Sequence, residues 1–256
     1  MERLVVDSLL NQFQHGDRRA LSRLLSLASR GECLDRMPNL PATKRQNCVV
    51  AVTGNGGVGK STLIGKLIPL IRKEEQTVAV LACDPRSPLT GGALLGDRFR
   101  MPASPEDDGV FIRSLAAASG QGSVAANLPA MIRLLKAFGF DWVVIETVGA
   151  GQGDTGIRNL ADVVVLLMQP ETGDDLQWEK AGLLEVADIV VIHKADLPGS
   201  ERTEDQIRDI LGLSADRSAK VVRASSKSGQ HIDELWQAIQ AVKNEKLTTE
   251  SQRTQS

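Results

Sequence analysis

Residues 54–62 read GNGGVGKST, a stretch that fits the pattern G-x-x-x-x-G-K-[ST]. The residues before it, 48–53, are apolar and β-branched, and residues 63–72 after it have helical spacing, so the stretch connects a strand to a helix. Glycines without a Cβ allow successive backbone N–H groups to turn toward an anion, and the helix adds its positive N-terminal end. The sequence therefore predicts a phosphate-binding loop.

All nine residues of this loop are candidate nucleotide contacts. Lys60 is expected to reach the β- and γ-phosphates, and the Ser61 hydroxyl is expected to ligate Mg²⁺, a hard ion that takes oxygen ligands. The alternative is a chance glycine-rich turn, which would not require the flanking strand, the lysine and the two hydroxyls found together here. The predicted contacts are Gly54, Asn55, Gly56, Gly57, Val58, Gly59, Lys60, Ser61 and Thr62.

The composition is that of an ordinary folded domain. The chain has 256 residues, of which 42% are hydrophobic and 24% charged, and a core of good size is expected. A net charge of −2 gives no basic surface for nucleic acid or an anionic membrane. The first residues already carry charges, unlike a signal peptide, and no apolar run approaches the ~20 residues of a membrane span. We expect a cytoplasmic location, without nucleic-acid or membrane partners.

Apolar, β-branched runs alternate with helical stretches along most of the chain. Because such strands are buried on both faces, the pattern predicts an α/β fold, a doubly wound and mostly parallel sheet with helices on both faces, as in P-loop NTPases. The predicted strands are 48–53, 77–83, 110–114, 141–146, 163–169, 189–193 and 221–225. The predicted helices include 2–14, 18–29, 63–72, 124–137, 176–184, 204–211 and 232–242.

Three segments follow from this pattern. Residues 1–46 are predicted to form an N-terminal helical extension, in which Asp17 caps the second helix, and a linker. Residues 47–242 are predicted to form the P-loop domain. Residues 243–256 are polar and are predicted to form a flexible tail.

Ligands of such sheets bind beyond the carboxyl ends of the strands, so the residues that follow each strand belong to one candidate site. Asp84 follows the second strand and Asp97 comes shortly after, and both carboxylates suit Mg²⁺ coordination. The alternative for Asp84 is a residue that only opens a turn at Pro85. Glu146 ends the fourth strand at the second metal-side position of P-loop nucleotidases, and Gly149 is placed to offer its N–H to the γ-phosphate.

Residues 193–196 read HKAD, close to the guanine signature N-K-x-D, with His193 where Asn is usual. Asp196 is expected to accept hydrogen bonds from the ring N–H and exocyclic amine of guanine, a donor pattern that adenine lacks, while the Lys194 stem packs over the base. An ordinary polar exit from a strand is the alternative. After the last strand, a backbone N–H is placed to reach the guanine carbonyl from the loop that contains Ser225, Ser226 and Lys227.

These residues together resemble the MeaB/ArgK family, the methylmalonyl-CoA mutase-associated GTPases within the SIMIBI class of P-loop proteins. The similarity runs from about residue 20 to residue 239. Its specific signatures are DPRSPLTGG at 84–92, LGD at 95–97 with RM at 100–101, ETVGAGQ at 146–152, and the stretch from DDLQ at 174–177 to KAD at 194–196.

The resemblance implies a Mg²⁺-dependent GTPase that binds GTP and GDP and hydrolyses GTP slowly without its partner. It implies a chaperone of an adenosylcobalamin-dependent acyl-CoA mutase, one that gates cofactor loading and protects or reactivates the enzyme. The implied Mg²⁺ ligands are Ser61, Asp84, Asp97 and Glu146. The implied catalytic residues are Lys60, Glu146 and Lys180, although Lys180 by itself also suits a solvated helix lysine.

The sequence departs from the family pattern at three places. The P-loop lacks the Pro usual near Gly56, the base motif begins with His193, and the long C-terminal dimerisation arm has no counterpart after Val242. Two alternatives for assembly therefore stay open. The chain forms a homodimer through its core or N-terminal helices, or it is a monomer until it meets its mutase.

Three other functions fit the sequence less well. A metal-centre maturation GTPase of the nickel-insertion type needs clustered thiols or imidazoles, whereas the three cysteines and three histidines here are scattered. A partitioning ATPase with the pattern K-G-G-x-G-K-[ST] needs a lysine where Asn55 stands. A non-hydrolysing scaffold that only binds nucleotide is a further alternative. The residues that argue against it are the intact Lys60, Ser61, Asp84 and Glu146.

Overall fold

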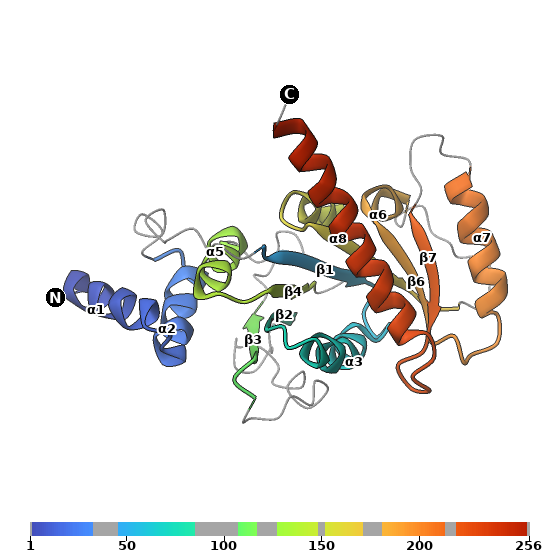
Figure 1. The fold of residues 1–256 in the computed structure, drawn as a ribbon. Coiled ribbons are helices and arrows are strands. Elements are labelled where there is room, and N and C mark those ends of the chain that lie inside the picture. The colour runs from blue at the N-terminus through green and yellow to red at the C-terminus, as the bar shows by residue number, and fades with distance from the viewer. Residues whose placement is uncertain are drawn as a thin grey trace.

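The computed structural model describes residues 2–32, 46–84, 107–116, 127–147, 152–170, 181–212 and 219–254. Seven strands form one sheet in the order β3-β2-β4-β1-β5-β6-β7, with parallel pairing throughout this part of the chain (Figure 1). The predicted doubly wound, parallel α/β fold is confirmed. The strands are β1 (Cys48–Gly54), β2 (Val78–Asp84), β3 (Val110–Ala116), β4 (Trp142–Glu146), β5 (Val163–Met168), β6 (Ile189–His193) and β7 (Lys220–Ala224).

Helices cover both faces of the sheet because alternate residues of each strand point to opposite sides. In β1, Val50 and Val52 join the hydrophobic cluster that contains α3 and α8, whereas Val49 and Ala51 join the cluster that contains α2 and α5. A third cluster packs α6 and α7 against β5 and β6. The helices are α1 (Glu2–Gln14), α2 (Arg18–Ser29), α3 (Lys60–Lys73), α5 (Leu128–Phe138), α6 (Ala181–Val186), α7 (Ser200–Gly212) and α8 (Ile232–Thr254), with the 3₁₀ helix η2 (Gln152–Asn159).

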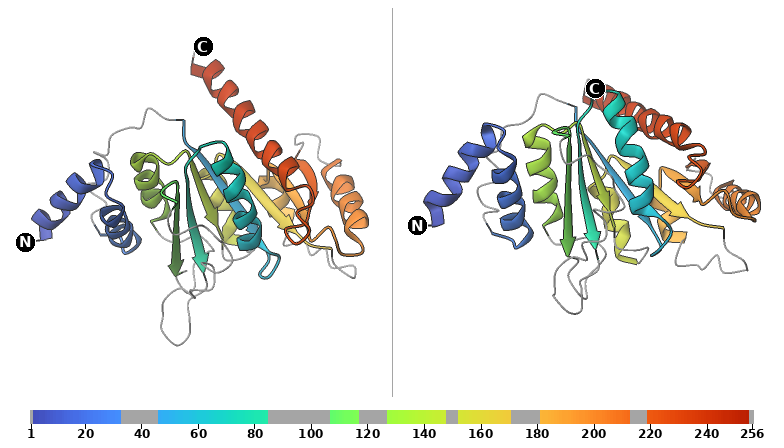
Figure 2. Two further views of the ribbon diagram at one scale, coloured as in Figure 1. Left: turned by 60° about the horizontal axis from the view of Figure 1, so that its bottom comes forward. Right: turned by 90° about the horizontal axis from the view of Figure 1, so that it is seen from below.

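The N-terminal helical pair packs on the edge of the domain beside α5 and β3, at the end of the molecule opposite α7 (Figures 1 and 2). Asp17 caps α2 as expected, since its Oδ1 accepts hydrogen bonds from the N–H groups of Arg19 and Ala20 at 2.7 and 2.9 Å. The Leu residues of α2 are fully buried in the cluster that includes α5, apart from the half-buried Leu27. Arg113 of β3 donates to Ser26 Oγ at 2.7 Å. The pair therefore shares a core with the sheet.

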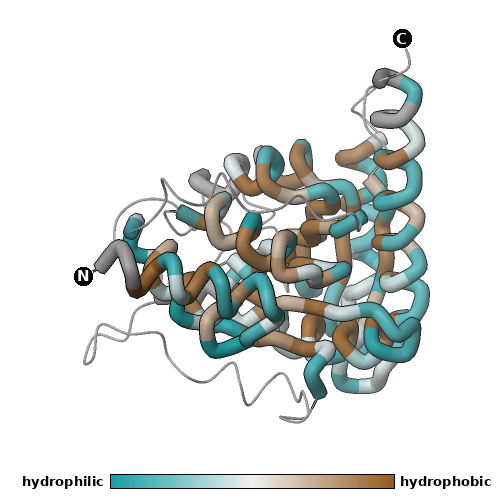
Figure 3. The backbone as a smooth tube through the Cα atoms, turned by 60° about the vertical axis from the view of Figure 1, so that its left-hand side comes forward, coloured by the Kyte–Doolittle hydropathy of each residue, from teal (hydrophilic) through white to brown (hydrophobic). Residues whose placement is uncertain are grey.

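The C-terminal segment differs from the prediction. Its polar composition predicts a flexible tail from residue 243, but α8 continues to Thr254. The turns after Val242 are mostly hydrophilic (Figure 3). Two lysines at the start of these turns nevertheless contact residues at the sheet. Lys243 Nζ lies 4.3 Å from the centre of the Trp142 ring, and Lys246 Nζ lies 2.8 Å from the Asp188 carboxylate. A polar segment can therefore stay attached, because aliphatic stems carry charged ends to distant partners.

The remaining differences lie at element boundaries. Helix α3 begins at Lys60, three residues before the predicted start, and α7 begins at Ser200 instead of 204. The predicted helix 176–184 is described only from Ala181, and η2 was not anticipated. Within the described part of the chain, no helix has the length and apolar character required to cross a membrane.

Candidate nucleotide site

The phosphate loop lies between β1 and α3, as the sequence predicted. Gly54, Gly57 and Gly59 have φ values of 143°, 74° and 105°, in the region that favours glycine. A Cβ on Gly59 would lie 2.5 Å from His193 Cε1, so the loop also depends on close approach to the end of β6. Asn55, Gly56 and Gly57 are exposed, whereas Val58 is buried. The first part of the loop is thus exposed to solvent, and the buried Val58 holds the loop to the core.

Lys60 begins α3, and its side chain lies over the loop. Its ammonium donates to the carbonyl oxygens of Gly54 at 2.8 Å and Asn55 at 3.1 Å, and the residue is buried. The first turn of α3 contains no acidic residue, so the positive end of the helix and the lysine act in the same direction. This arrangement favours an anion. Thr62 is exposed on the same turn.

Ser61 and Glu146 form the described part of the predicted metal site. The Ser61 hydroxyl donates to Glu146 Oε1 at 2.7 Å, and both residues are buried. Their side-chain ligand atoms are oxygens, which suits Mg²⁺. Asp84 ends β2 beside the strand that carries Glu146, but its side chain lies outside the described residues, as does all of Asp97.

The base motif follows β6 and is tied to the phosphate loop. The imidazole of His193 lies with Nδ1 2.7 Å from Val58 O and Nε2 2.8 Å from Ser226 Oγ. Lys194 donates to Gly57 O at 3.1 Å and to Gln169 Oε1 at 2.7 Å. Burial lowers the pKa of His193. The three segments that the sequence assigned to one nucleotide are therefore in direct contact.

Asp196 lies at the exposed rim of this arrangement. Its Oδ1 accepts a hydrogen bond from the Ser225 hydroxyl at 2.6 Å, and this bond holds the pKa of the carboxyl below its ordinary value. Asp196 is thus a carboxylate that faces solvent while one of its oxygens is fixed by the loop after β7. This group suits recognition of paired N–H donors. Ser225 and Ser226 are buried, and Lys227 is exposed.

The structure brings together most of the predicted site, namely residues 54–62, Glu146, residues 193–196 and residues 225–227. Gly149 and Lys180 lie outside the described residues, so their predicted roles stay predictions. Sequence reasoning missed Gln169, the partner of Lys194, and the buried hydroxyl pair in which Thr147 donates to Thr53 at 3.0 Å. Their positions at strand ends are the signal that marked the other site residues.

Comparison with solved structures supports the fold. A structure described as LAO/AO transport system kinase matches with a TM-score of 0.67 at 23% identity, over 98% of this chain and 83% of that one. HypB from Helicobacter pylori, solved in complex with nickel, matches with a TM-score of 0.58 at 16% identity, over 87% and 96% of the two chains. At these identities the likeness shows a shared P-loop fold alone.

Relatives identified by sequence are closer. A putative GTPase of Pyrococcus abyssi is 42% identical over 92% of this chain and 75% of its own length. The GTPase ArgK of Escherichia coli is 37% identical over 74% and 60% of the two chains. The mouse methylmalonic aciduria type A homolog, described as mitochondrial, is 34% identical over 90% of this chain and 55% of its own length. The family model described as methylmalonyl Co-A mutase-associated GTPase MeaB matches residues 28–256. The chain therefore belongs to the MeaB family of GTPases.

Proposed function

We propose that this chain is a Mg²⁺-dependent GTPase that uses its nucleotide state to regulate an adenosylcobalamin-dependent acyl-CoA mutase. The observation that carries the nucleotide part is the direct contact between the phosphate loop and the base motif, through His193 to Val58 and Lys194 to Gly57. One ligand with phosphates at one end and a purine at the other fits these two sites together. Membership of a family of GTPases supports hydrolysis as its reaction.

The phosphates would be held by the backbone N–H groups of the loop and by Lys60. The Lys60 ammonium, which donates to two loop carbonyls, would exchange these contacts for the β- and γ-phosphate oxygens. Ser61 and Glu146 would hold Mg²⁺, with Asp84 and Asp97 as further proposed ligands. The ion would neutralise charge on the phosphates during transfer to water. Lys180 and Gly149 are proposed to assist at the γ-phosphate.

The guanine would be selected by Asp196. Because the Ser225 bond keeps this carboxylate ionised and fixes one oxygen, it is ready to accept from the ring N–H and exocyclic amine of the base. Adenine presents no such pair of donors. The Lys194 stem, half-buried above the loop, is proposed to pack over the purine ring.

The partner is proposed from the family. Its model is described by association with methylmalonyl-CoA mutase, and the mouse relative bears the name of a methylmalonic aciduria. Gated loading of the cofactor and protection or reactivation of the mutase are the roles we propose. The likeness to HypB does not support the metal-centre alternative, because at 16% identity it shows the fold alone. The Cys48 thiol is buried and its pKa is raised to about 12, which disfavours a thiolate ligand at this position.

Nucleotide competition tests the first half of the proposal. We expect GDP and GTP with Mg²⁺ to bind at least about tenfold more tightly than ADP and ATP, because only guanine offers two donors to Asp196. Isothermal titration at fixed salt measures the four affinities. Equal affinities would remove the guanine assignment.

Complex formation tests the second half. A purified adenosylcobalamin-dependent acyl-CoA mutase should co-elute with the chain in size-exclusion chromatography, and the amount of complex should differ between GDP and a non-hydrolysable GTP analogue. A mutase that fails to bind in every nucleotide state would contradict the chaperone role while leaving the GTPase assignment intact. Tight binding of Ni²⁺ by the purified chain would favour the metal-centre alternative.

A further inference from the structure

His193 occupies a junction between three segments that are far apart in the sequence. It ends β6, and its ring lies against the phosphate loop on one side and the loop after β7 on the other. The ring is buried, with 3% of the residue exposed. Gly59 packs so closely on Cε1 that any side chain there would overlap the ring. The imidazole is therefore held in one position.

The partners of the ring decide where its proton is. Val58 O is a carbonyl oxygen and can only accept, so Nδ1 at 2.7 Å must carry the hydrogen. Nε2 faces the Ser226 hydroxyl at 2.8 Å and the Ser226 N–H at 3.4 Å, and both can donate. In a neutral imidazole the second nitrogen is an acceptor. The contacts are thus complete for the neutral ring with its proton on Nδ1.

The surroundings agree with an uncharged ring. Burial is the largest influence on the pKa of His193 and lowers it, and the neighbouring Lys194 lowers it further. The hydrogen bond to Val58 and the charge of Asp196 act in the opposite direction. Lys227, in the loop that carries Ser226, is a further exposed cation. Lys60 is the cation of the phosphate loop, and its ammonium lies at Gly54 and Asn55.

We propose that His193, as the neutral Nδ1–H tautomer, is the positioning residue that joins the phosphate site to the base site and sets guanine affinity. The linkage runs from Val58 through His193 to Ser226, and from the adjacent Ser225 to the Asp196 carboxylate. A change in the phosphate loop is thereby transmitted to the group that reads the base. This inference rests on the proposed binding of guanine nucleotides.

The tautomer is tested on the wild-type protein without any substitution. With three histidines in the chain, ¹⁵N–¹H correlation of histidine side chains gives few signals, and His193→Asn identifies the signal of interest. At pH 7.5, with and without GDP, we expect a protonated Nδ1 and an unprotonated Nε2. A proton on Nε2, or on both nitrogens, overturns the assignment.

Three substitutions test the linkage. His193→Phe keeps a planar ring and removes both nitrogens, so GDP affinity should fall about tenfold, the usual effect of leaving buried polar partners unmatched. His193→Asn keeps a donor at the place of Nδ1 but is too short to reach Ser226, so its loss should be smaller. Ser226→Ala removes only the hydroxyl partner of Nε2 and should weaken binding about threefold in the wild type. In His193→Phe the same change should have no further effect.

Matched controls separate the possible failures. Melting of each nucleotide-free variant, followed by circular dichroism, establishes that it is folded, and Gln230→Ala, at an exposed position of the same loop, serves as the neutral substitution. If the wild-type protein shows no preference for guanine, the proposed function fails. If the wild-type protein prefers guanine but folded His193→Phe binds GDP equally well, or if the effects of His193→Phe and Ser226→Ala simply add, the positioning role fails.

Discussion

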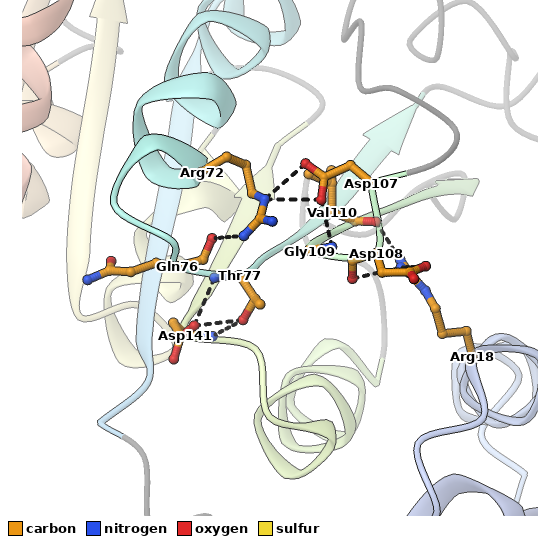
Figure 4. Close-up of polar contacts among 9 residues, drawn as sticks. All are labelled: Arg18, Arg72, Gln76, Thr77, Asp107, Asp108, Gly109, Val110 and Asp141. Atoms are coloured by element: carbon orange, nitrogen blue, oxygen red, sulfur yellow. Dashed lines mark hydrogen bonds and ion pairs between the residues drawn. The ribbon is translucent and has the colours of Figure 1, made fainter.

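At the two ends of the sheet, the described basic side chains have different partners. At the amino ends of β2, β3 and β4, carboxylates pair with cations, hydroxyls and N–H groups across elements (Figure 4). Asp107 binds Arg72 Nε at 2.9 Å and the Gly109 N–H at 2.8 Å, and Asp141 accepts from the Thr77 hydroxyl at 2.7 Å. At the carboxyl ends, Lys60 and Lys194 donate to loop carbonyls.

The different partners of the basic side chains indicate different functions for the two ends of the sheet. Opposite charges already matched within the protein join α3 to the edge of the sheet and leave little attraction for a ligand. An ammonium on a carbonyl can exchange this neutral acceptor for the charged oxygen of an anion, which binds the ammonium more strongly. We therefore expect substitutions at the carboxyl ends to change ligand binding, and substitutions at the amino ends to change the free energy of unfolding.

Lys60→Ala should have the largest effect. Without the ammonium that would reach the phosphates, GDP and GTP affinity should fall more than about 100-fold, or more than about 2.7 kcal/mol. The melting temperature without nucleotide should change less than the affinity, because the described contacts of the ammonium are to carbonyl oxygens of the phosphate loop. Titration calorimetry measures both nucleotides, and Lys66→Ala on the exposed side of α3 is the control. Retained affinity would refute the phosphate role of Lys60.

Asp196→Ala should have the next largest effect, on selectivity. The ratio of GDP to ADP affinity should fall at least about tenfold, roughly 1.4 kcal/mol, because the acceptor for the two guanine donors is gone. Competition against a fluorescent GDP analogue measures the ratio, with Asp209→Ala on the exposed side of α7 as the matched carboxylate loss. An unchanged guanine preference would show that another group reads the base.

Gly109→Ala tests the opposite end of the sheet. A Cβ there would overlap the Arg72 guanidinium, which must then leave Asp107. The free energy of unfolding should fall by about 1 kcal/mol, since the pair is partly exposed, while GDP affinity should stay within about twofold. Urea unfolding measures the loss. In an Arg72→Ala background, Gly109→Ala should lower the free energy of unfolding by less. An equal loss in both backgrounds would contradict this explanation.

The smallest expected effect is on the pH dependence of stability. His193 at the carboxyl ends of the strands and Asp107 at the amino ends should change stability in different pH ranges. Burial lowers the pKa of folded His193, so the unfolded chain binds more protons below about pH 6.5, and stability declines as pH falls from there. The Arg72 hydrogen bond lowers the pKa of Asp107, so its contribution is lost only as pH falls below about 4.

Urea unfolding at pH 7.5, 5.0 and 3.5 checks this separation. His193→Asn should reduce the loss of stability between pH 7.5 and 5.0, whereas Asp107→Asn should reduce it only between pH 5.0 and 3.5. Identical pH profiles for the two variants would contradict the separation. Light scattering at each pH checks that the protein does not aggregate.

Much of the fold was predictable because continuous apolar strands have a strong local signal. The range predicted for β6, and those for α1 and α2, agree with the structure at both ends. The prediction failed at α8, whose second half is polar by sequence and is held by Lys243 on Trp142 and Lys246 on Asp188. Those partners are about 60 to 100 residues away, so no local pattern contains them.

The candidate site was predictable residue by residue but not as a set of contacts. The loop motif predicted Ser61, the HKAD motif predicted Asp196, and a strand-end position predicted Glu146. These residues were expected at one site because parallel strands bring their carboxyl ends to one edge. Gln169 was missed, since a polar residue after a strand is common and only the folded chain shows Lys194 beside it. The contacts of His193 could not be predicted for the same reason, because its three partner atoms belong to two other loops.

The sequence by itself determined that this chain folds as a parallel α/β domain with a phosphate loop, and which family it resembles, because periodicity and loop chemistry are local properties. Only the tertiary structure decided that α8 remains helical beyond residue 242 and that His193 bridges Val58 and Ser226. It also decided which partners the described basic side chains have at the two ends of the sheet. Those features depend on distances between segments remote in the chain, and folding alone sets such distances.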